Sequence, residues 1–354
     1  MILRHCFVAV VWHLCAIAAP AQIFTFLQGQ ELLDSLAASY KPTTELDYGD
    51  ARDTLYSRIY KTGDSVTCVY SGYKRYLPPG EDPSVAIFDN GSSFGINCEH
   101  TFPQSKGAET GNPQSDMHHL FPTRSAVNTA RSNDPFAEIP DQQTTQWYHL
   151  DHVSTSIPAT GIEQYSEHIN GYFEPREDHK GNVARAMFYF YTMYKVQADA
   201  ADPTFFASQR ETLCHWQYLD PADSLEIART WLIAHYQDGK PNPYILDCTL
   251  PARSFCSDVP ITCAFPPIAT GEPQSAISKQ DQPLTIIPNP ARQSLTLGVT
   301  VAGSLTITDP VGRLVLRQPW QPGDEIEASA LPAGVYFVVL QQEQGNWIGR
   351  LSKE

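Results

Sequence analysis

The stretch NCEHTFPQS, residues 97–105, places a carboxylate and an imidazole side by side at the end of an apparent β-strand. It is followed by DMHHLFP at 116–122 and by AVNTARSN at 126–133, where a helix is expected to begin. Because neighbouring strand residues point to opposite faces, Glu99 and His100 can serve one site only if the chain bends there. The three segments therefore predict a polar site built from a strand end, a loop and a helix start.

The residue types in these segments suit a particular chemistry. Glu99 and Asn128 would present oxygen ligands, which suit a hard cation such as Mg²⁺, with Mn²⁺ and Ca²⁺ as alternatives. His100 is suited to act as a general base, since an unperturbed imidazole has a pKa of about 6.5. Phosphodiester hydrolysis needs only an ion that polarises the phosphate and an imidazole that activates water. A zinc hydrolase using His100, His118 and His119 is the alternative enzyme.

The segments EHTFPQS, DMHHLFP and VNTARSNDPF, in this order, resemble the endonuclease I family of secreted nucleases. The resemblance extends to GNVARAMFYFYTMY at 181–194, more loosely to 219–223 and 240–247, and covers roughly residues 28–255. It implies an α+β fold in which a mainly helical nuclease domain, residues 22–265, carries a ββα-metal finger.

The resemblance also implies roles for individual side chains. Glu99 and Asn128 fall at the family's metal ligands, and His100 falls at its general base. His119, where related enzymes often carry Asn, would position the finger and orient His100, whereas His118 lies near the site without an assigned step. The implied activity is a non-specific endonuclease that cleaves DNA, with RNA left open, and yields 5′-phosphate and 3′-hydroxyl ends.

The cation that would stabilise the phosphate is less well defined by the resemblance. Some family members carry an arginine for this role in a long insert, but the spacer here, residues 101–115, is short. Arg124 is the first candidate because it lies on the loop before the expected helix, and Arg131 and Lys106 are the others. Asn133 is expected to be structural, with a phosphate contact as the alternative.

The chain is acidic. It has 354 residues, with 24 Lys+Arg against 39 Asp+Glu and a formal charge of −15, and at about 150 residues per domain this length suggests two domains. The charge argues against a broad cationic surface for nucleic acid. We expect weak binding without sequence preference, mainly to phosphates, by a monomer whose groove is lined by Lys106, Arg124, Arg131 and Arg185.

Residues 1–21 are predicted to be a secretory signal peptide. A charged start precedes a short apolar run, and the small residues Ala19-Pro20-Ala21 follow it as a cleavage pattern. A buried first helix is the alternative. No later apolar stretch reaches the about 20 residues that a membrane-spanning helix needs. We therefore expect an exported chain that is secreted or attached to the cell surface.

Cleavage after residue 21 would leave six of the eight cysteines. An even number of cysteines in an exported chain favours disulfides. We expect Cys68 to pair with Cys98, and the remaining four cysteines to pair within residues 214–263. The rival interpretation is a zinc site at the last three of these, although their spacing is wider than that of usual zinc ligands.

Within the first domain, helices are expected over residues 30–40, 50–60 and 182–195, and Asp223 begins a capping-box pattern with a Glu three residues later. The helix at 182–195 carries an aromatic stripe. This stripe is expected to be core rather than a platform on which bases stack.

The C-terminal part has a different texture. Residues 266–283 are rich in Pro, Ser, Gln and Gly and predict a linker, and the short β-branched runs of 284–354 are typical of a small antiparallel β-sandwich. IPNPA at 287–291, LPAGVYF at 331–337 and RLSKE at 350–354 resemble a type IX secretion C-terminal sorting domain. That resemblance implies recognition by outer-membrane export machinery, which often removes the module or replaces it with an anchor. A binding module in a non-catalytic surface protein is the alternative.

Overall fold

The computed structural model of the chain describes residues 23–260, Cys263, and residues 282–353 without 309–313, 330, 333 and 343–344. The predicted signal peptide, and the predicted linker except its last two residues, lie outside the described residues. Two separate hydrophobic cores are present, one within residues 32–259 and one within 284–351. In the described ranges, no helix has both the length and the apolar character that a membrane crossing needs.

The first core is built mainly by helices and has short strands at its edge. The α-helices are α1 (Gly29–Tyr40), α2 (Tyr48–Thr54), α3 (Pro83–Phe88), α4 (Asn112–Ser115), α5 (Ser125–Arg131), α6 (Lys180–Met193), α7 (Lys195–Ala201), α8 (Phe205–Leu219), α9 (Ser224–Ala234), α10 (Pro243–Leu246) and α11 (Leu250–Ser254). The strands are β1 (Lys61–Thr62), β2 (Ser65–Thr67), β3 (Lys74–Tyr76), β4 (Ile96–His100), β5 (Leu120–Arg124), β6 (Gln146–His149), β7 (His152–Ser154), β8 (Ser166–Ile169) and β9 (Tyr172–Glu174).

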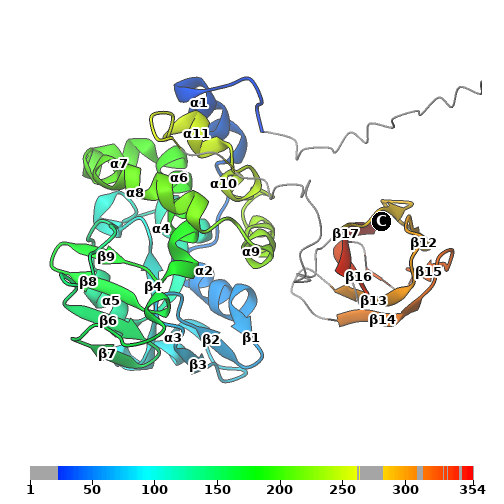
Figure 1. Ribbon diagram of the computed structural model, residues 1–354, viewed down its shortest axis with the longest axis horizontal. Coiled ribbons are helices and arrows are strands. Elements are labelled where there is room, and N and C mark those ends of the chain that lie inside the picture. The colour runs from blue at the N-terminus through cyan, green and yellow to red at the C-terminus, as the bar shows by residue number, and fades with distance from the viewer. Residues whose placement is uncertain are drawn as a thin grey trace, which may run out of the picture.

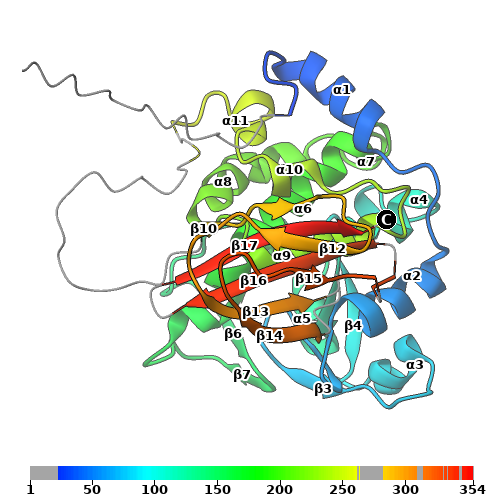
Figure 2. The ribbon, with the colours of Figure 1, turned by 90° about the vertical axis from the view of Figure 1, so that its right-hand side faces the viewer.

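In both views, α1, α7, α10 and α11 gather at one end of this part of the chain, and β3, β6 and β7 lie at the opposite end (Figures 1 and 2). The strands form three sheets, with the orders β1-β2-β3, β4-β5 and β7-β6-β8-β9. The chain is therefore α+β, as the sequence predicts. The two-stranded β4-β5 sheet belongs to the segment that carries the polar motifs.

Helix α6 is the centre of the first core, because nearly all of its residues are buried. Its aromatic stripe packs in the core, as expected, and full burial of each large apolar side chain contributes about 1.5–3 kcal/mol. The helix ends at Met193 because Tyr194 leaves helical geometry, with φ −127° and ψ 31°. Its start requires Gly181, since a Cβ there would lie 1.8 Å from the carbonyl oxygen of Asp220.

Strands β4 and β5 and helix α5 form one compact unit. The strands are antiparallel, with His100 opposite Leu120 and Glu99 opposite Phe121. Helix α5 follows β5 without a loop and contacts both strands. The backbone N–H of Ser125 donates to the carbonyl of Gly95, which fixes the start of the helix beside the start of β4.

The cysteine prediction is half right. Disulfides join Cys214 to Cys256 and Cys248 to Cys263, as expected for that segment, and this excludes a zinc site at those cysteines. The predicted pairing of Cys68 with Cys98 is wrong, because both are buried free thiols.

Each of these two thiols has its own polar partner. The Cys68 sulfur accepts a hydrogen bond from the backbone N–H of Arg124 on β5. Cys98 interacts with the hydroxyl groups of Tyr48 and Tyr56, and burial raises its pKa to about 12. The two sulfurs therefore lie in different surroundings.

The second core lies between two groups of strands. A five-stranded sheet has the order β10-β17-β16-β13-β14, and a three-stranded sheet has the order β11-β12-β15. Pairing is antiparallel except between β10 and β17, which run parallel. The strands are β10 (Gln282–Pro283), β11 (Ile286–Ile287), β12 (Ser294–Leu297), β13 (Gly303–Thr308), β14 (Leu314–Trp320), β15 (Ile326–Glu327), β16 (Gly334–Gln342) and β17 (Gly345–Lys353).

Strand β10 occupies residues that were expected to end the linker. Buried side chains from both sheets, among them Leu295, Ile326, Leu305 and Val338, form a single cluster. The short β-branched runs of this region are therefore strands, as predicted.

Candidate functional site

A cavity of about 580 Å³ opens beside the end of β4. Residues from β4, from the turn that follows it, from α5 and from the start of α2 line this cavity: Tyr48, Asn97, Cys98, Glu99, His100, Pro103, Gln104, Ser105, Asn128, Ser132 and Asn133. Four of the predicted site residues, Glu99, His100, Asn128 and Asn133, are thus brought together. The bend expected at the end of the strand is present, since β4 ends at His100 and the chain bends at Thr101 and Phe102.

Glu99 is a buried carboxylate with one oxygen engaged. Its Oε1 accepts a hydrogen bond from the Tyr70 hydroxyl at 3.0 Å and lies 3.3 Å from the Nε of Arg131. Burial raises the pKa of Glu99 to about 7, although Arg131 and Tyr70 both favour the charged form. In the described part of the chain, Oε2 takes no hydrogen bond, so this oxygen is available to a ligand in the cavity.

Asn128 presents the second available oxygen. Its Nδ2 donates a hydrogen bond to the carbonyl of Cys98 at 3.3 Å, which orients the amide between α5 and β4. Among the described residues no donor reaches its Oδ1. The side chain is half-buried and lines the same cavity as Glu99. A carboxylate oxygen and an amide oxygen are the donor types that a hard divalent cation prefers.

His100 is buried, but its ring borders the cavity. Its Nε2 lies 3.0 Å from the carbonyl oxygen of Gln114, which only an Nε2–H can satisfy, so the lone pair of the neutral ring is on Nδ1. Burial lowers the pKa of His100 to about 4; the Gln114 carbonyl opposes this shift, and the charges of Arg131 and Arg52 add to it. The ring is therefore neutral at pH 7 and able to accept a proton.

Two aromatic rings hold His100 in place. The ring of His119 contacts it edge to face, with a centroid distance of 5.4 Å. The ring of Tyr48, at the start of α2, also contacts it with a centroid distance of 5.4 Å. His119 itself is fixed by a 2.7 Å hydrogen bond from Nε2 to the carbonyl of Pro113. His119 therefore contacts His100 but does not line the cavity, and its role in orienting His100 stays a prediction.

His118 points away from the site. Its Nε2 is hydrogen-bonded to the carbonyl of Lys240 at 2.8 Å, and its ring packs on Tyr189. The three histidines thus bind three different carbonyls and do not converge. Within the described residues, no group of three His, Cys, Asp or Glu side chains could hold a metal ion. The zinc hydrolase built on these histidines has no geometric basis in the described part of the chain.

The cations expected to contact phosphate are all engaged elsewhere. The buried Arg124 donates to the carbonyls of Asp151 and His152. Lys106 forms a 2.8 Å ion pair with Asp202. Neither of these side chains borders the cavity, although Arg124 was the first candidate.

Arg131 and Arg185 also use their guanidinium groups in contacts within the protein. Arg131 is fully buried, and it donates to the carbonyls of His100 and Thr101 beside its contact with Glu99. Arg185 is buried in an ion pair with Glu226 and does not line the groove as expected. Arg131 therefore holds the end of β4 against α5 from behind the cavity.

Asn133 borders the cavity, and its Nδ2 donates to the Ser105 hydroxyl at 3.2 Å. This bond ties the end of α5 to the turn after β4. The side chain is exposed, and its Oδ1 accepts a hydrogen bond from the Ser132 hydroxyl at 3.5 Å. Asn133 thus makes a contact within the chain at the edge of the site, and whether it also contacts phosphate stays a prediction.

Several partners of the site carry no local sequence signal. Asp116 is fully buried and accepts hydrogen bonds from the hydroxyl groups of Tyr189 and Tyr194 and from the amide of Gln237. Arg229 on α9 donates to the carbonyls of Met117 and Leu120, at the start of β5. These contacts come from far along the chain, and they fix the histidine segment that supports His100.

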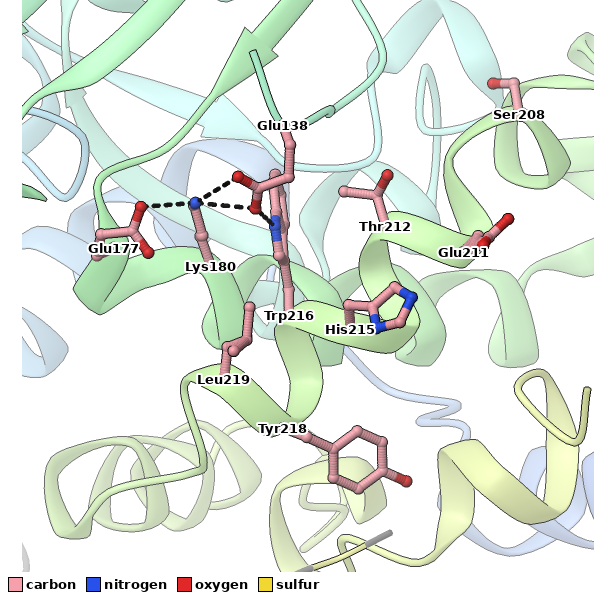
Figure 3. Close-up of a pocket in the computed structure, with 10 residues that line it drawn as sticks. All are labelled: Glu138, Glu177, Lys180, Ser208, Glu211, Thr212, His215, Trp216, Tyr218 and Leu219. Carbon is pink, nitrogen blue, oxygen red and sulfur yellow. Dashed lines mark hydrogen bonds and ion pairs between the residues drawn. The ribbon is translucent and has the colours of Figure 1, made fainter. Parts of the chain in front are cut away.

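A larger hollow, of about 660 Å³, lies away from this site, against α8 and the start of α6 (Figure 3). Lys180, although buried, forms ion pairs with Glu138 and Glu177, and the Trp216 indole donates to Glu138 (Figure 3). Lys180 also pairs with Glu174. Burial lowers the pKa of Lys180, but the surrounding carboxylates outweigh it and raise the pKa above its usual value. These charged groups pair with one another. The ion-pair network beside the hollow therefore stabilises the start of α6.

Comparisons with known proteins cover both parts of the chain. Residues 29–248 match the profile of the endonuclease I family, and residues 285–354 match that of the secretion system C-terminal sorting domain. An extracellular ribonuclease of Bacillus subtilis (strain 168) is 27% identical over 251 residues, which cover 61% of this chain and 81% of that protein. An extracellular ribonuclease of Bacillus amyloliquefaciens is 29% identical over 175 residues, which cover 46% of this chain and 55% of that protein.

Proposed function

Because the chain belongs to the endonuclease I family, we propose that it is a divalent-metal-dependent endonuclease that hydrolyses DNA without sequence preference. At a coarser level, the chain is a secreted or cell-surface nuclease, since it carries that family's domain and a secretion sorting domain. The observation that carries the proposal is the meeting of Glu99, Asn128 and His100 on one cavity. The names of the two relatives support RNA as a further substrate.

In the proposed reaction His100 is the general base. Its Nε2–H is held by the Gln114 carbonyl, so Nδ1 takes the proton from a water molecule that attacks phosphorus. The phosphorus–O3′ bond then breaks and the departing oxygen takes a proton from solvent, which leaves 5′-phosphate and 3′-hydroxyl ends. The contact with His119 orients the imidazole, and its neutral state at pH 7 supports this role.

The cavity fits a small divalent cation, which we propose to be Mg²⁺. Glu99 offers Oε2 and Asn128 offers Oδ1, and neither oxygen has a donor among the described residues. Burial disfavours the charged form of Glu99 and raises its pKa, and a cation beside the carboxylate would favour the charged form. When bound, such an ion polarises the phosphate and stabilises negative charge on the departing oxygen.

Finer parts of the fold belong to the same proposal. The antiparallel β4 and β5 with the contiguous α5 support a ββα-metal finger, with Glu99 and His100 from a strand and Asn128 from the helix. The single core shared by two sheets supports a β-sandwich for the sorting module, which export machinery of the outer membrane would recognise. The domain limits, at residues 22–265 and 284–354, and the monomeric state stay predictions.

The test is nicking of supercoiled plasmid by the purified full chain, with Mg²⁺ and with EDTA. Cleavage is expected with Mg²⁺, and its loss in EDTA is expected to be reversed by added metal. His100→Ala should lower the rate by at least about 10²-fold, because the base is lost. His235→Ala removes an exposed histidine at the end of α9 and serves as the matched control. Wild-type rates in a folded His100→Ala variant would contradict the assignment.

A further inference from the structure

The cavity needs a positive group for its substrate, and the side chains expected to provide one are engaged elsewhere. Arg131 contacts Glu99, Lys106 pairs with Asp202, and Arg124 donates to backbone carbonyls. In a chain of net charge −15, a polyanion is not held by general attraction. A specific cation beside the cavity must then make the contact.

Arg52 is the candidate, because it contacts a lining residue although it does not itself line the cavity. It lies on α2 one turn after Tyr48, and its guanidinium carbon is 4.7 Å from the centroid of the Tyr48 ring. Tyr48 lines the cavity, and its ring packs on His100. Arg52 is therefore one aromatic ring away from the proposed base.

Arg52 has no partner of opposite charge. In the described part of the chain it forms no ion pair or hydrogen bond, and its Nε is buried without an acceptor. Because this donor is buried without an acceptor, an anion that reaches it satisfies a polar group that is otherwise unpaired. The contact with the Tyr48 ring holds the guanidinium group in place, which reduces the entropy lost when the fork binds an anion.

We propose that Arg52 binds a backbone phosphate of the nucleic acid beside the phosphate that is cleaved, and that Tyr48 positions it. The proposal rests on the proposed function and names the contact that the engaged arginines do not make. A guanidinium recognises phosphate through two parallel N–H···O bonds, and this contact is independent of base sequence. It therefore agrees with cleavage without sequence preference.

The test measures binding of a short DNA duplex by the full chain in Mg²⁺, at salt concentrations from 50 to about 300 mM. His100→Ala is present throughout so that the duplex stays intact. Adding Arg52→Ala should weaken binding by about tenfold and reduce the slope of log K against log salt by about 0.9, which corresponds to one phosphate contact. Arg52→Lys, which keeps the charge but not the fork, should restore most of the slope and only part of the affinity.

Arg58→Ala is the matched control. It removes the same charge from the exposed side of the next turn, η1 (Leu55–Ile59), and should leave the slope unchanged. Melting curves of all variants separate a folding defect from a binding defect. An unchanged slope in folded Arg52→Ala, or an equal loss in Arg58→Ala, overturns the proposal and leaves Arg52 a structural partner of Tyr48.

The proposed function can fail independently of this contact. A wild-type chain that neither nicks plasmid nor binds the duplex rejects the nuclease site and the Arg52 contact together. A wild-type chain that nicks plasmid, combined with an unchanged slope in Arg52→Ala, rejects only the contact.

Discussion

At the scale of single residues, Glu99 meets both of its protein partners through the same oxygen. Tyr70 and Arg131 hold Oε1, so the carboxylate is oriented before any ligand arrives. The same burial that keeps His100 neutral also disfavours a charged Glu99. Burial at the end of β4 therefore keeps His100 neutral, as a base must be, and leaves Glu99 in surroundings where a cation would stabilise its charged form.

We predict that Mg²⁺ stabilises the folded chain through Glu99. A cation that binds only the folded state should add about 2.7 kcal/mol at 100 times its Kd, seen as a higher Tm in melting curves with and without Mg²⁺. Glu99→Gln should abolish this increase and lower nicking by at least about 10²-fold, whereas the exposed Glu109→Gln should keep both. An undiminished Mg²⁺ effect in Glu99→Gln would show that the ion binds elsewhere.

We also predict a loss of stability in acid from buried histidines. Burial lowers the pKa of His118 to about 4 and that of His179 to about 3, from 6.5. The unfolded chain therefore takes up protons first, and the free energy of unfolding decreases as the pH falls from about 6.5 toward 4. His118 alone should account for up to about 3 kcal/mol.

The measurement is the Tm between pH 7.5 and pH 4. The wild type is expected to lose Tm over this range, and His118→Gln, although less stable at pH 7.5, should lose less. The difference between the two curves gives the contribution of His118 alone. The contribution of the carboxyl groups, which can raise the Tm as the pH falls, is the same in both curves and cancels. Parallel curves would mean that His118 is protonated in the folded chain as readily as in the unfolded one.

At the scale of elements, the unit of β4, β5 and α5 is supported from the opposite side by α9. Arg229 of α9 donates to two carbonyls at the start of β5 and lies 4.3 Å from the centroid of the Phe121 ring. The cap of this helix is the predicted one, since the Asp223 side chain accepts from the backbone N–H of Glu226. Polar residues of α9 therefore face inward, where they anchor the site.

Arg229→Met should destabilise the chain by about 3 kcal/mol, because the carbonyls of Met117 and Leu120 lose the hydrogen bonds from Arg229, although the Leu120 N–H still donates to Met117. Urea unfolding measures this loss. Nicking should fall as well, since β5 and the histidine segment lose their support. Arg58→Ala, on an exposed turn, should change the free energy of unfolding by less than about 0.5 kcal/mol. A neutral Arg229→Met would contradict the anchoring role.

The sequence predicts the elements that carry the motifs and misses the contacts that support them. The strand end at His100, the helices over 29–40 and 180–193 and the cap at Asp223 follow from local patterns. The sheet of β6 to β9 was not predicted, because its strands have three or four residues and mixed polarity. Arg229 carries no local mark of its role, since its partners are more than a hundred residues away.

The phosphate cation shows the same limit. Proximity in sequence favoured Arg124, but burial turned its guanidinium toward the carbonyls of Asp151 and His152. The pairing of Cys68 with Cys98 failed for a related reason, since each sulfur has its own donor on a neighbouring element. Which polar groups satisfy one another is decided by tertiary contacts that neither composition nor spacing reveals.

At the scale of the whole molecule, the two cores share no residue. The proposed catalytic groups all belong to the first core, and the match to the sorting domain covers only the second. We predict that a chain ending at residue 265 keeps nicking activity within about twofold and loses export. Plasmid nicking and secretion from the native host check the two halves of this prediction, and an inactive but folded fragment would contradict it.

The disulfides give a second prediction at this scale. Cys214 and Cys256 are 42 residues apart, and closing a loop of that size stabilises by about 4 kcal/mol in the chain-entropy model. Replacing both with Ser should lower the free energy of unfolding by a comparable amount in urea titrations. Thiol titration of the denatured, exported wild type should find two free thiols, those of Cys68 and Cys98. A count of zero free thiols would instead support a disulfide between these two cysteines.

The bond between Cys248 and Cys263 lies at the end of the first core, where the chain leaves toward its C-terminal module. A pulling force on that module during export would reach the first domain at Cys263. The disulfide would carry this force to Cys248, and the disulfide between Cys256 and Cys214 would carry it to the middle of α8. The terminal helix α11 lies within the loop that the Cys248–Cys263 disulfide closes. A force that would unfold a free helical end is therefore carried by covalent disulfide bonds.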